Sequence, residues 1–223
     1  GPDAEFANDS WQSTVMSYFS QTQNPNVNAS KAFALSLMSG DIAAAQILYG
    51  VAGNLRTGDT IYGENGNTGG ILDTFVNARE ATAYTILDDG GIDTIDYSSS
   101  PDDQTIDLRD GAISNVRGKI GNLIIHEGTV IENIRSGSGD DTLIGNDAIN
   151  IIEGGGGADC VDGGDGLDVF VARGLSSDYT AVTNGDFLEL TDAAGVTVTL
   201  NNIELLRFDD LDINPNEGLE PQN

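Results

Sequence analysis

A nine-residue repeat between Ser136 and Val171 constrains the fold of this chain more than any other feature. Its four copies read SGSGDDTLI, GNDAINIIE, GGGGADCVD and GGDGLDVFV, and they begin at Ser136, Gly145, Gly154 and Gly163 without insertion. The last two copies match G-G-x-G-x-D-x-U-x, where U is apolar, at every fixed position. The first copy departs only at Ser136, and the second keeps only its first glycine and its apolar residue. The alternative is a flexible Gly/Asp-rich linker, but a linker would not repeat an apolar residue at every ninth position.

The pattern predicts a flattened coil of tight turns and short strands. Consecutive glycines permit positive φ and close backbone approach, so six residues can turn with their carbonyls facing inward. The other three residues of each copy form a short strand whose middle side chain points into the core. These inward residues are Leu143, Ile152, Val161 and Phe170. Successive turns should alternate between two sides, so that the Ser136 turn stacks on the Gly154 turn and the Gly145 turn on the Gly163 turn.

The same pattern resembles the calcium-binding repeat of RTX β-helices, which implies Ca²⁺ between stacked turns. Main-chain carbonyls and a carboxylate at the sixth position are the hard oxygen ligands that Ca²⁺ prefers. The second copy has a neutral Asn150 at this position, so the ion shared by the Gly145 and Gly163 turns should be the first lost on chelation. The expected ligand residues of the roll are Gly137, Gly139, Asp141, Asn146, Ala148, Asn150, Gly154, Gly155, Gly157, Asp159, Gly163, Gly164, Gly166 and Asp168.

The composition is strongly acidic. Nine Lys and Arg residues stand against 36 Asp and Glu, a net charge of −27, which argues against nucleic acid or anionic membranes as partners. Acids concentrated in turns indicate that folding depends on bound cations, whereas a merely soluble acidic surface is the alternative. The single Cys160 excludes an internal disulfide and a Cys-based zinc cluster, and it is expected to point outward. No apolar run approaches the roughly 18 residues of a membrane span, and no signal peptide is visible.

The first fifty residues are expected to be helical. Gly1-Pro2 is typical of a protease-cleavage scar, so residues 1–6 are interpreted as vector-derived. The pattern predicts helices over Lys31–Met38 and over Asp41–Tyr49, the second with Ile42, Ala45, Leu48 and Tyr49 on one face and with Gly50 as its stop.

Several segments resemble serralysin-type zinc metalloproteases. V-M-S-Y-F from Val15, D-I-A-A-A-Q-I-L-Y-G from Asp41 and R-T-G-D-T-I-Y-G from Arg56 are similar to the junction of their catalytic and calcium-binding domains. The likeness covers about residues 14–171. It implies that Met16 is the methionine of the Met-turn and that Tyr18 matches a tyrosine that ligates zinc or steadies the tetrahedral intermediate.

The zinc site of that family is missing from this chain. It requires H-E-x-x-H-x-x-G-x-x-H, but His126 is the only histidine and Glu127 is not followed by x-x-His. Without three nitrogen ligands no catalytic zinc is held, so Zn²⁺ belongs only to a full-length parent. The chain alone is not expected to be a protease, and Met16 and Tyr18 are expected to pack in a core.

An earlier calcium loop is implied by the same resemblance. The half-repeat from Asp88 to Asp96 has Gly91 and Asp93 at the glycine and aspartate positions. The family pairs it with the Arg56–Thr60 loop around one ion, although an ordinary turn is the alternative. The implied ligands are the carbonyls of Arg56, Gly58 and Gly90, together with Thr60, Asp88 and Asp93. Glu132 and the carbonyl of Val130 are implied for the first ion of the roll, and a surface glutamate is the alternative for Glu132.

Short alternating segments from Arg56 onward predict strands. They are Thr60–Tyr62, Ala83–Leu87, Thr94–Tyr97, Thr105–Leu108, Leu123–Ile125, Val130–Ile134, Tyr179–Thr183, Phe187–Thr191, Val196–Leu200 and Ile203–Phe208. The last four, around turns at Asn184-Gly185 and Ala194-Gly195, should be antiparallel and cap the open end of the coil over residues 179–208. Residues 215–223 form a polar tail that is expected to fray and lacks the acidic-then-apolar ending of a type I secretion signal.

These observations predict a mainly β protein: a parallel β-roll embedded in a β-sandwich over residues 51–214, after a short helical segment over residues 7–50. The leading interpretation is a secreted, extracellular module that binds several Ca²⁺ ions and supports an N-terminal protease domain, with the type I secretion apparatus as a further partner. A calcium-dependent adhesion module or a pseudo-protease is the alternative. A third reading, in which a second chain supplies histidines for peptide hydrolysis, is the least favoured.

Overall fold

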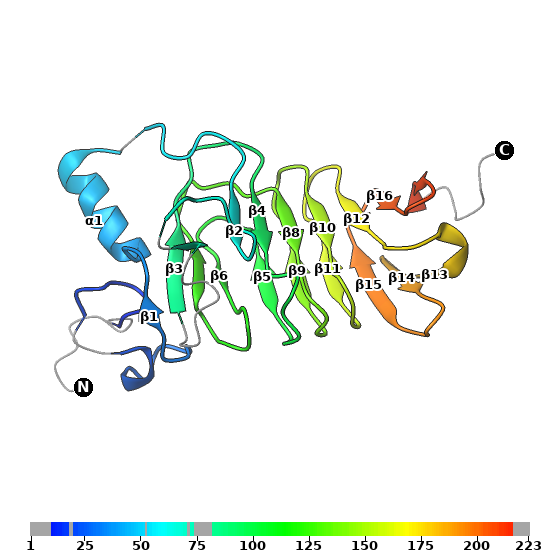
Figure 1. The fold of residues 1–223 in the computed structure, drawn as a ribbon, viewed down its shortest axis with the longest axis horizontal. Helices are drawn as coiled ribbons and strands as arrows, with labels where there is room; N and C mark the ends of the chain where they lie inside the picture. Colours follow the sequence, from blue (N-terminus) through cyan, green and yellow to red (C-terminus); the bar gives the residue numbers. More distant parts are fainter. Residues whose placement is uncertain (1–9, 18–19, 52, 71, 74–81, 216–223) are drawn as a thin grey trace.

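The computed structural model describes residues 10–17, 20–51, 53–70, 72–73 and 82–215. Its strands are stacked along the long axis of an elongated molecule, with helix α1 (Ser39–Tyr49) at the N-terminal end and a β-hairpin at the C-terminal end (Figure 1). Two long sheets face each other, and a smaller sheet lies beside the N-terminal segment.

Alternate turns of the chain contribute to alternate sheets, as the nine-residue period predicts. The seven-stranded sheet has the order β17 (Asp212–Ile213), β16 (Leu205–Arg207), β12 (Val169–Val171), β10 (Ile151–Glu153), β8 (Asn133–Arg135), β4 (Thr94–Asp96) and β2 (Ile61–Gly63). The six-stranded sheet has the order β13 (Thr180–Asn184), β14 (Phe187–Thr191), β15 (Thr197–Asn201), β11 (Cys160–Asp162), β9 (Thr142–Ile144) and β5 (Thr105–Asp107). Within the repeats all pairings are parallel and 18 residues apart, so the prediction of a parallel β-roll is confirmed.

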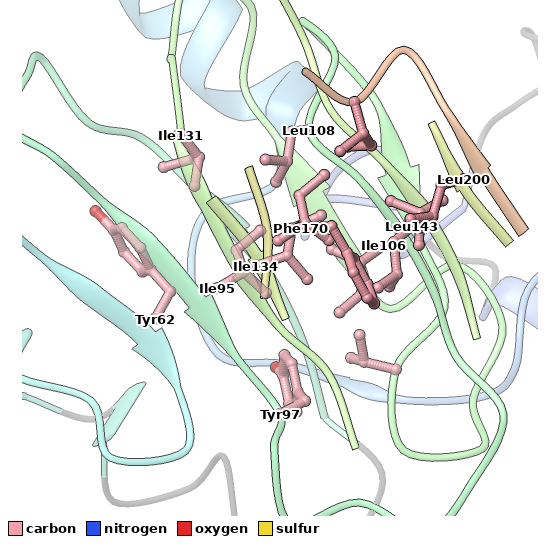
Figure 2. Close-up of a cluster of buried hydrophobic side chains, with 14 of the residues drawn as sticks. Tyr62, Ile95, Tyr97, Ile106, Leu108, Ile131, Ile134, Leu143, Phe170 and Leu200 are labelled. Carbon is pink, nitrogen blue, oxygen red and sulfur yellow. The ribbon is translucent and has the colours of Figure 1, made fainter. Parts of the chain in front are cut away.

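The core is the row of inward side chains between the two sheets. Leu143 and Ile152 are fully buried, and Val161 and Phe170 are only 3% and 4% exposed. Phe170 and Leu143 lie in one cluster with the isoleucines of the neighbouring strands (Figure 2). Cys160 is exposed, as predicted.

The C-terminal strands close the roll as expected, but the fourth, β16, does not pair antiparallel with the other three. β14 lies between β13 and β15 and pairs antiparallel with each of them. β15 also pairs in parallel with β11, and β16 pairs in parallel with β12. The last repeat strand of each sheet is therefore covered by one closing strand, β11 by β15 and β12 by β16.

The N-terminal segment differs from the prediction in several places. Helix α1 spans Ser39–Tyr49, starts two residues early and ends at Gly50, where φ is 86°. Ile42 is buried, but Leu48 and Tyr49 of the predicted apolar face are exposed. The predicted helix over Lys31–Met38 is wrong, because Phe33–Ala34 forms strand β1 against Thr82–Ala83.

Strand β1 joins the smaller sheet, which has the order β1 (Phe33–Ala34), β3 (Thr82–Ile86), β7 (Leu123–Ile125) and β6 (Ile113–Ser114). A short 3₁₀ helix, η1, spans Gln21–Gln23. Among the described residues no helix is both long and apolar enough to cross a membrane.

Met16 is 79% exposed, so the expectation that it packs in a core is wrong. Its segment is bound to the first turn of helix α1, where the Asp41 carboxylate accepts hydrogen bonds from the Thr14 hydroxyl and from the Val15 amide, the latter at 2.9 Å. Tyr18, the expected vector residues 1–6 and most of the tail lie outside the described residues.

Candidate metal sites in the stacked turns

The first stack of turns pairs the Ser136 turn with the Gly154 turn. The Gly156 amide donates to the Gly137 carbonyl at 2.8 Å, and the Asp141 amide donates to Asp159 Oδ1 at 3.0 Å. Each aspartate therefore holds the backbone of the preceding turn. Glycine is required where the turns touch: Gly155 has φ of +89°, and a Cβ there would lie 2.0 Å from the Gly137 carbonyl oxygen.

The second stack pairs the Gly145 turn with the Gly163 turn. The Asn150 amide donates to Asp168 Oδ1 at 2.8 Å. A Cβ on Gly145 would lie 2.0 Å from the Gly163 carbonyl oxygen and 2.3 Å from Asn150 Oδ1. The sequence-predicted partners of both stacks are thus brought together.

The Arg56–Thr60 loop and the Asp88–Asp96 half-repeat are joined by the same type of hydrogen bond, from a backbone amide to an aspartate carboxylate. The Thr60 amide donates to Asp93 Oδ1 at 2.7 Å, and the Asp93 amide donates to Glu132 Oε2 at 2.7 Å. Glu132 therefore belongs to this stack of turns and is not an isolated surface glutamate. The neighbouring Val130 is 50% exposed, and because its side chain is apolar, only its main-chain carbonyl could serve as a metal ligand.

The Arg56 and Asp88 loops lie against each other. A Cβ on Gly91 would meet the Gly58 carbonyl oxygen at 2.8 Å, and the Asp89 amide donates to the Leu55 carbonyl at 2.9 Å. Asp88 is buried and already accepts hydrogen bonds from the Tyr62 hydroxyl and the Gly90 amide.

Burial shapes the electrostatics of the turns. Desolvation is the largest cause of each shift, and it raises the pKa of Asp159 to about 7 and the pKa values of Asp93 and Asp168 to about 6. It also raises the pKa values of Asp141 and Glu132. Neighbouring acids add to the effect: Asp141 and Asp140 act on Asp159, and Glu204 and Asp162 act on Asp168.

The five arginines that form ion pairs in the described part of the chain do not pair with these acids. Their ion-pair partners are acids that lie outside the stacked turns. The pairs are Arg109–Asp107, Arg117–Glu64, Arg135–Asp96, Arg173–Glu153 and Arg207–Asp212. The buried acids of the turns therefore carry negative charge that these arginines leave uncompensated, and burying an unpaired charge is costly.

The donor set fits a hard cation. Asp93 and Asp168 are fully buried, and their Oδ2 atoms have no hydrogen-bond partner in the described part of the chain. In the same part, no group of three or more His, Cys, Asp or Glu side chains converges as a metal cluster. A metal site here must therefore combine one or two carboxylates with main-chain carbonyls, a combination that suits Ca²⁺ better than Zn²⁺.

The Gly145 turn is satisfied by its own amides. Asn150 Oδ1 accepts from the Asn146 amide at 2.8 Å, and Asn150 Nδ2 donates to the Glu132 carbonyl at 3.0 Å. The Asn146 side chain donates to the Ile131 carbonyl at 2.8 Å. Neutral side-chain amides of this turn therefore bind the carbonyl oxygens of Ile131 and Glu132.

The only histidine takes part in packing. His126 is 3% exposed; its Nδ1 lies 3.0 Å from the Ser39 hydroxyl and its Nε2 lies 3.2 Å from Gln46 Oε1. Both ring nitrogens are thus occupied by helix α1.

Sequence reasoning missed the loop beneath the first stack. The Ser138 amide donates to the Ser100 carbonyl at 2.9 Å, and the Gln104 amide donates to Asp141 Oδ1 at 2.7 Å. The available signal was the similarity of Asp103-Gln104-Thr105 to Asp140-Asp141-Thr142, with glutamine in place of aspartate. Glu204, which accepts from the Asp168 amide at 2.7 Å, was also missed.

The fold and its turns define a parallel β-roll domain with buried acids in glycine-rich turns. The sequence profile of the Peptidase M10 serralysin C-terminal family matches residues 52–214, so the chain belongs to this family. It is 43% identical to Serralysin C of Dickeya chrysanthemi over 131 residues, which is 59% of this chain and 27% of the relative.

Other relatives give the same result. Identity is 41% over 135 residues with Metallopeptidase AprA of Pseudomonas marginalis, covering 59% of this chain and 28% of the relative. It is 39% over 130 residues with Serralysin of Proteus mirabilis, covering 58% and 26%. The chain thus spans about a quarter of the length of the curated relatives it matches.

Proposed function

We propose that the chain is a secreted calcium-binding RTX module, the C-terminal domain of a serralysin-like zinc metalloprotease, which folds on extracellular calcium. The observation that carries the proposal is the convergence of buried, uncompensated carboxylates with carbonyls in the stacked turns. Asp159, at 2% exposed, with its pKa raised to about 7 by burial, is the clearest case.

The residues that hold the ions are those of the two stacks and of the earlier loop pair. Asp141 and Asp159 bind the ion of the first stack. Asp168 and the carbonyls of the Gly145 turn bind the ion of the second stack. Asp93, Glu132 and Thr60 bind the ion of the earlier loops. Bound Ca²⁺ supplies positive charge against their carboxylates. The aspartates then keep their second role, in which one oxygen accepts an amide hydrogen bond from the preceding turn.

Folding and calcium binding are coupled in this proposal. Because the turns do not exist in the unfolded chain, the free energy of binding contributes to the free energy of folding. At submicromolar calcium the acids repel one another and the chain stays extended, which suits export by a type I secretion apparatus. At millimolar calcium the roll forms and supports the protease domain of the parent, where zinc and peptidase activity would reside.

Equilibrium dialysis with radioactive Ca²⁺ tests the binding. The wild-type chain should bind several ions at millimolar calcium, and Asp159→Asn should weaken at least one of them by about tenfold or more. Glu127→Gln, which removes one negative charge from the exposed turn after β7, is the matched control and should bind as wild type does. A wild-type chain that binds no calcium at this concentration would refute the proposal.

The protease parent is tested by the upstream reading frame. We expect it to encode H-E-x-x-H before the residues shown. A start codon immediately before Ala7 would instead support a pseudo-protease or an adhesion module.

A further inference from the structure

The turn that connects β15 to β16 takes the place of a further repeat turn. Asn201 pairs with Asp162, the last residue of β11, and Leu205 pairs with Val169, the first residue of β12. Residues 202–204 therefore stand against residues 163–168, with three residues where the repeat uses six. This closing turn contains no glycine, which is why the repeat pattern does not reveal it.

The closing turn reproduces the hydrogen bonds of an earlier turn. The Asp168 amide donates to Glu204 Oε2 at 2.7 Å, and the Glu204 and Leu205 amides donate to the Asp168 carbonyl at 3.1 and 3.0 Å. At the other end of the same sheet, the Asp93 amide donates to Glu132 Oε2 at 2.7 Å, and the Glu132 and Asn133 amides donate to the Asp93 carbonyl at 3.3 and 2.9 Å. Glu204 thus stands to Asp168 as Glu132 stands to Asp93.

Two oxygen atoms face the same space beside Gly163. A Cβ there would lie 2.1 Å from the Asn202 carbonyl oxygen and 2.6 Å from Asp168 Oδ2. In the preceding turn the Gly163 carbonyl and Asn150 Oδ1 take the corresponding positions over Gly145. The Asn202 carbonyl therefore replaces a repeat carbonyl, and Asn202 reaches this position with φ of 50°.

The Asp168 carboxylate has one oxygen left over. Its Oδ1 accepts from the Asn150 amide, whereas Oδ2 is buried and has no hydrogen-bond partner among the described residues. Asp93 Oδ2 is likewise buried without a hydrogen-bond partner among the described residues, and Asp93 is the other aspartate whose amide donates to a glutamate. Arg207, on the adjacent strand, pairs with Asp212 instead, at 3.4 Å. A hollow lined by Leu200, Asn202 and Glu204 lies beside the closing turn.

We propose that the closing turn completes an additional calcium site beyond the repeats, formed by Asp168 Oδ2, the Glu204 carboxylate and the Asn202 carbonyl. This inference rests on the proposed function, because it extends the calcium sites of the roll by one. The ion would tie strand β16 to the last repeat, so that the cap and the roll become ordered together.

The test compares Glu204→Gln with wild type by counting bound ions in native mass spectrometry and by calcium titration calorimetry. The side-chain amide oxygen of the introduced glutamine can still accept from the Asp168 amide, so the variant removes the charge and keeps the structural bond. We expect one ion fewer, or one ion bound at least about tenfold more weakly. Glu127→Gln, on the exposed turn after β7, is the matched control and should equal wild type.

The outcomes separate the two proposals. If Glu204→Gln binds as many ions as wild type with equal affinity, the closing-turn site is refuted and the calcium roll stands. If the wild-type chain binds no calcium, both proposals fail. Anomalous scattering from wild-type crystals grown in CaCl₂ gives a second answer that does not depend on how the variant folds. A peak beside Asp168 Oδ2 and Glu204 is expected, and peaks in the repeat turns alone would refute the site.

Discussion

At the scale of single residues, the roll depends on glycines that face a carbonyl of the neighbouring turn. Gly155 has φ of +89° and no room for a Cβ, whereas its neighbour Gly156 would place a Cβ 3.8 Å from Ser138. Two adjacent glycines in one turn therefore carry different constraints, in agreement with the repeat pattern, which requires glycine at the position of Gly155 and leaves the position of Gly156 free.

Gly155→Ala should lower the free energy of unfolding by about 1–3 kcal/mol, because alanine is strained at positive φ and would displace the Gly137 carbonyl. Gly156→Ala is the matched control and should change stability by less than about 0.5 kcal/mol. Urea unfolding in saturating calcium measures both. Equal stability of the two variants would contradict the close stacking of these turns.

The buried acids also predict a pH dependence of the calcium-free fold. Burial raises the pKa of Asp159 from its ordinary value of 3.8 to about 7, so the folded state binds more protons than the unfolded state between these values. The calcium-free fold is then most stable below the unfolded value and loses stability as pH rises through the folded value. Protein stripped of calcium should show more β signal in circular dichroism at pH 5.5 than at pH 8.

Asp159→Asn should reduce this difference, because an amide does not ionise. A calcium-free protein whose β signal grows from pH 5.5 to pH 8 would contradict the burial of these acids without counter-ions.

Among the helices and strands, those that belong to a local repeat could be predicted from the sequence, and those that depend on distant pairing could not. Leu143 and Val161 mark their strands because the nine-residue period fixes turn, strand and inward side chain together. Phe33–Ala34 could not be predicted as a strand, since it pairs with Thr82–Ala83 about fifty residues later and no local pattern records that partner. The closing turn was missed for a related reason: Glu204 matches Asp168 only through the register of β15 and β16.

The two stacks of turns should release calcium in a fixed order. Asn146 and Asn150 already satisfy the Gly145 turn by hydrogen bonds, so the ion shared with the Gly163 turn should leave before the ion held by Asp141 and Asp159. Amide resonances of Asn150 and Asp141 in a chelator titration report the two stacks separately. Earlier loss of the Asp141 signal would overturn this order.

At the scale of the whole molecule, the fold is a column of turns whose acids lie buried near one another, within a chain of net charge −27. The apolar row inside the column holds the two sheets together, but the turns at both sides need positive charge that the ion-paired arginines do not supply. We therefore propose that calcium is part of the fold and not an addition to it.

A far-UV circular dichroism titration of the calcium-stripped chain tests this claim most directly. At neutral pH the spectrum should be that of a largely unfolded chain in excess chelator and should gain β signal cooperatively as free calcium approaches the millimolar range. Magnesium at the same concentration should restore little of the signal, because it demands a smaller octahedral site. Equal β content with excess chelator and with millimolar calcium would contradict the account.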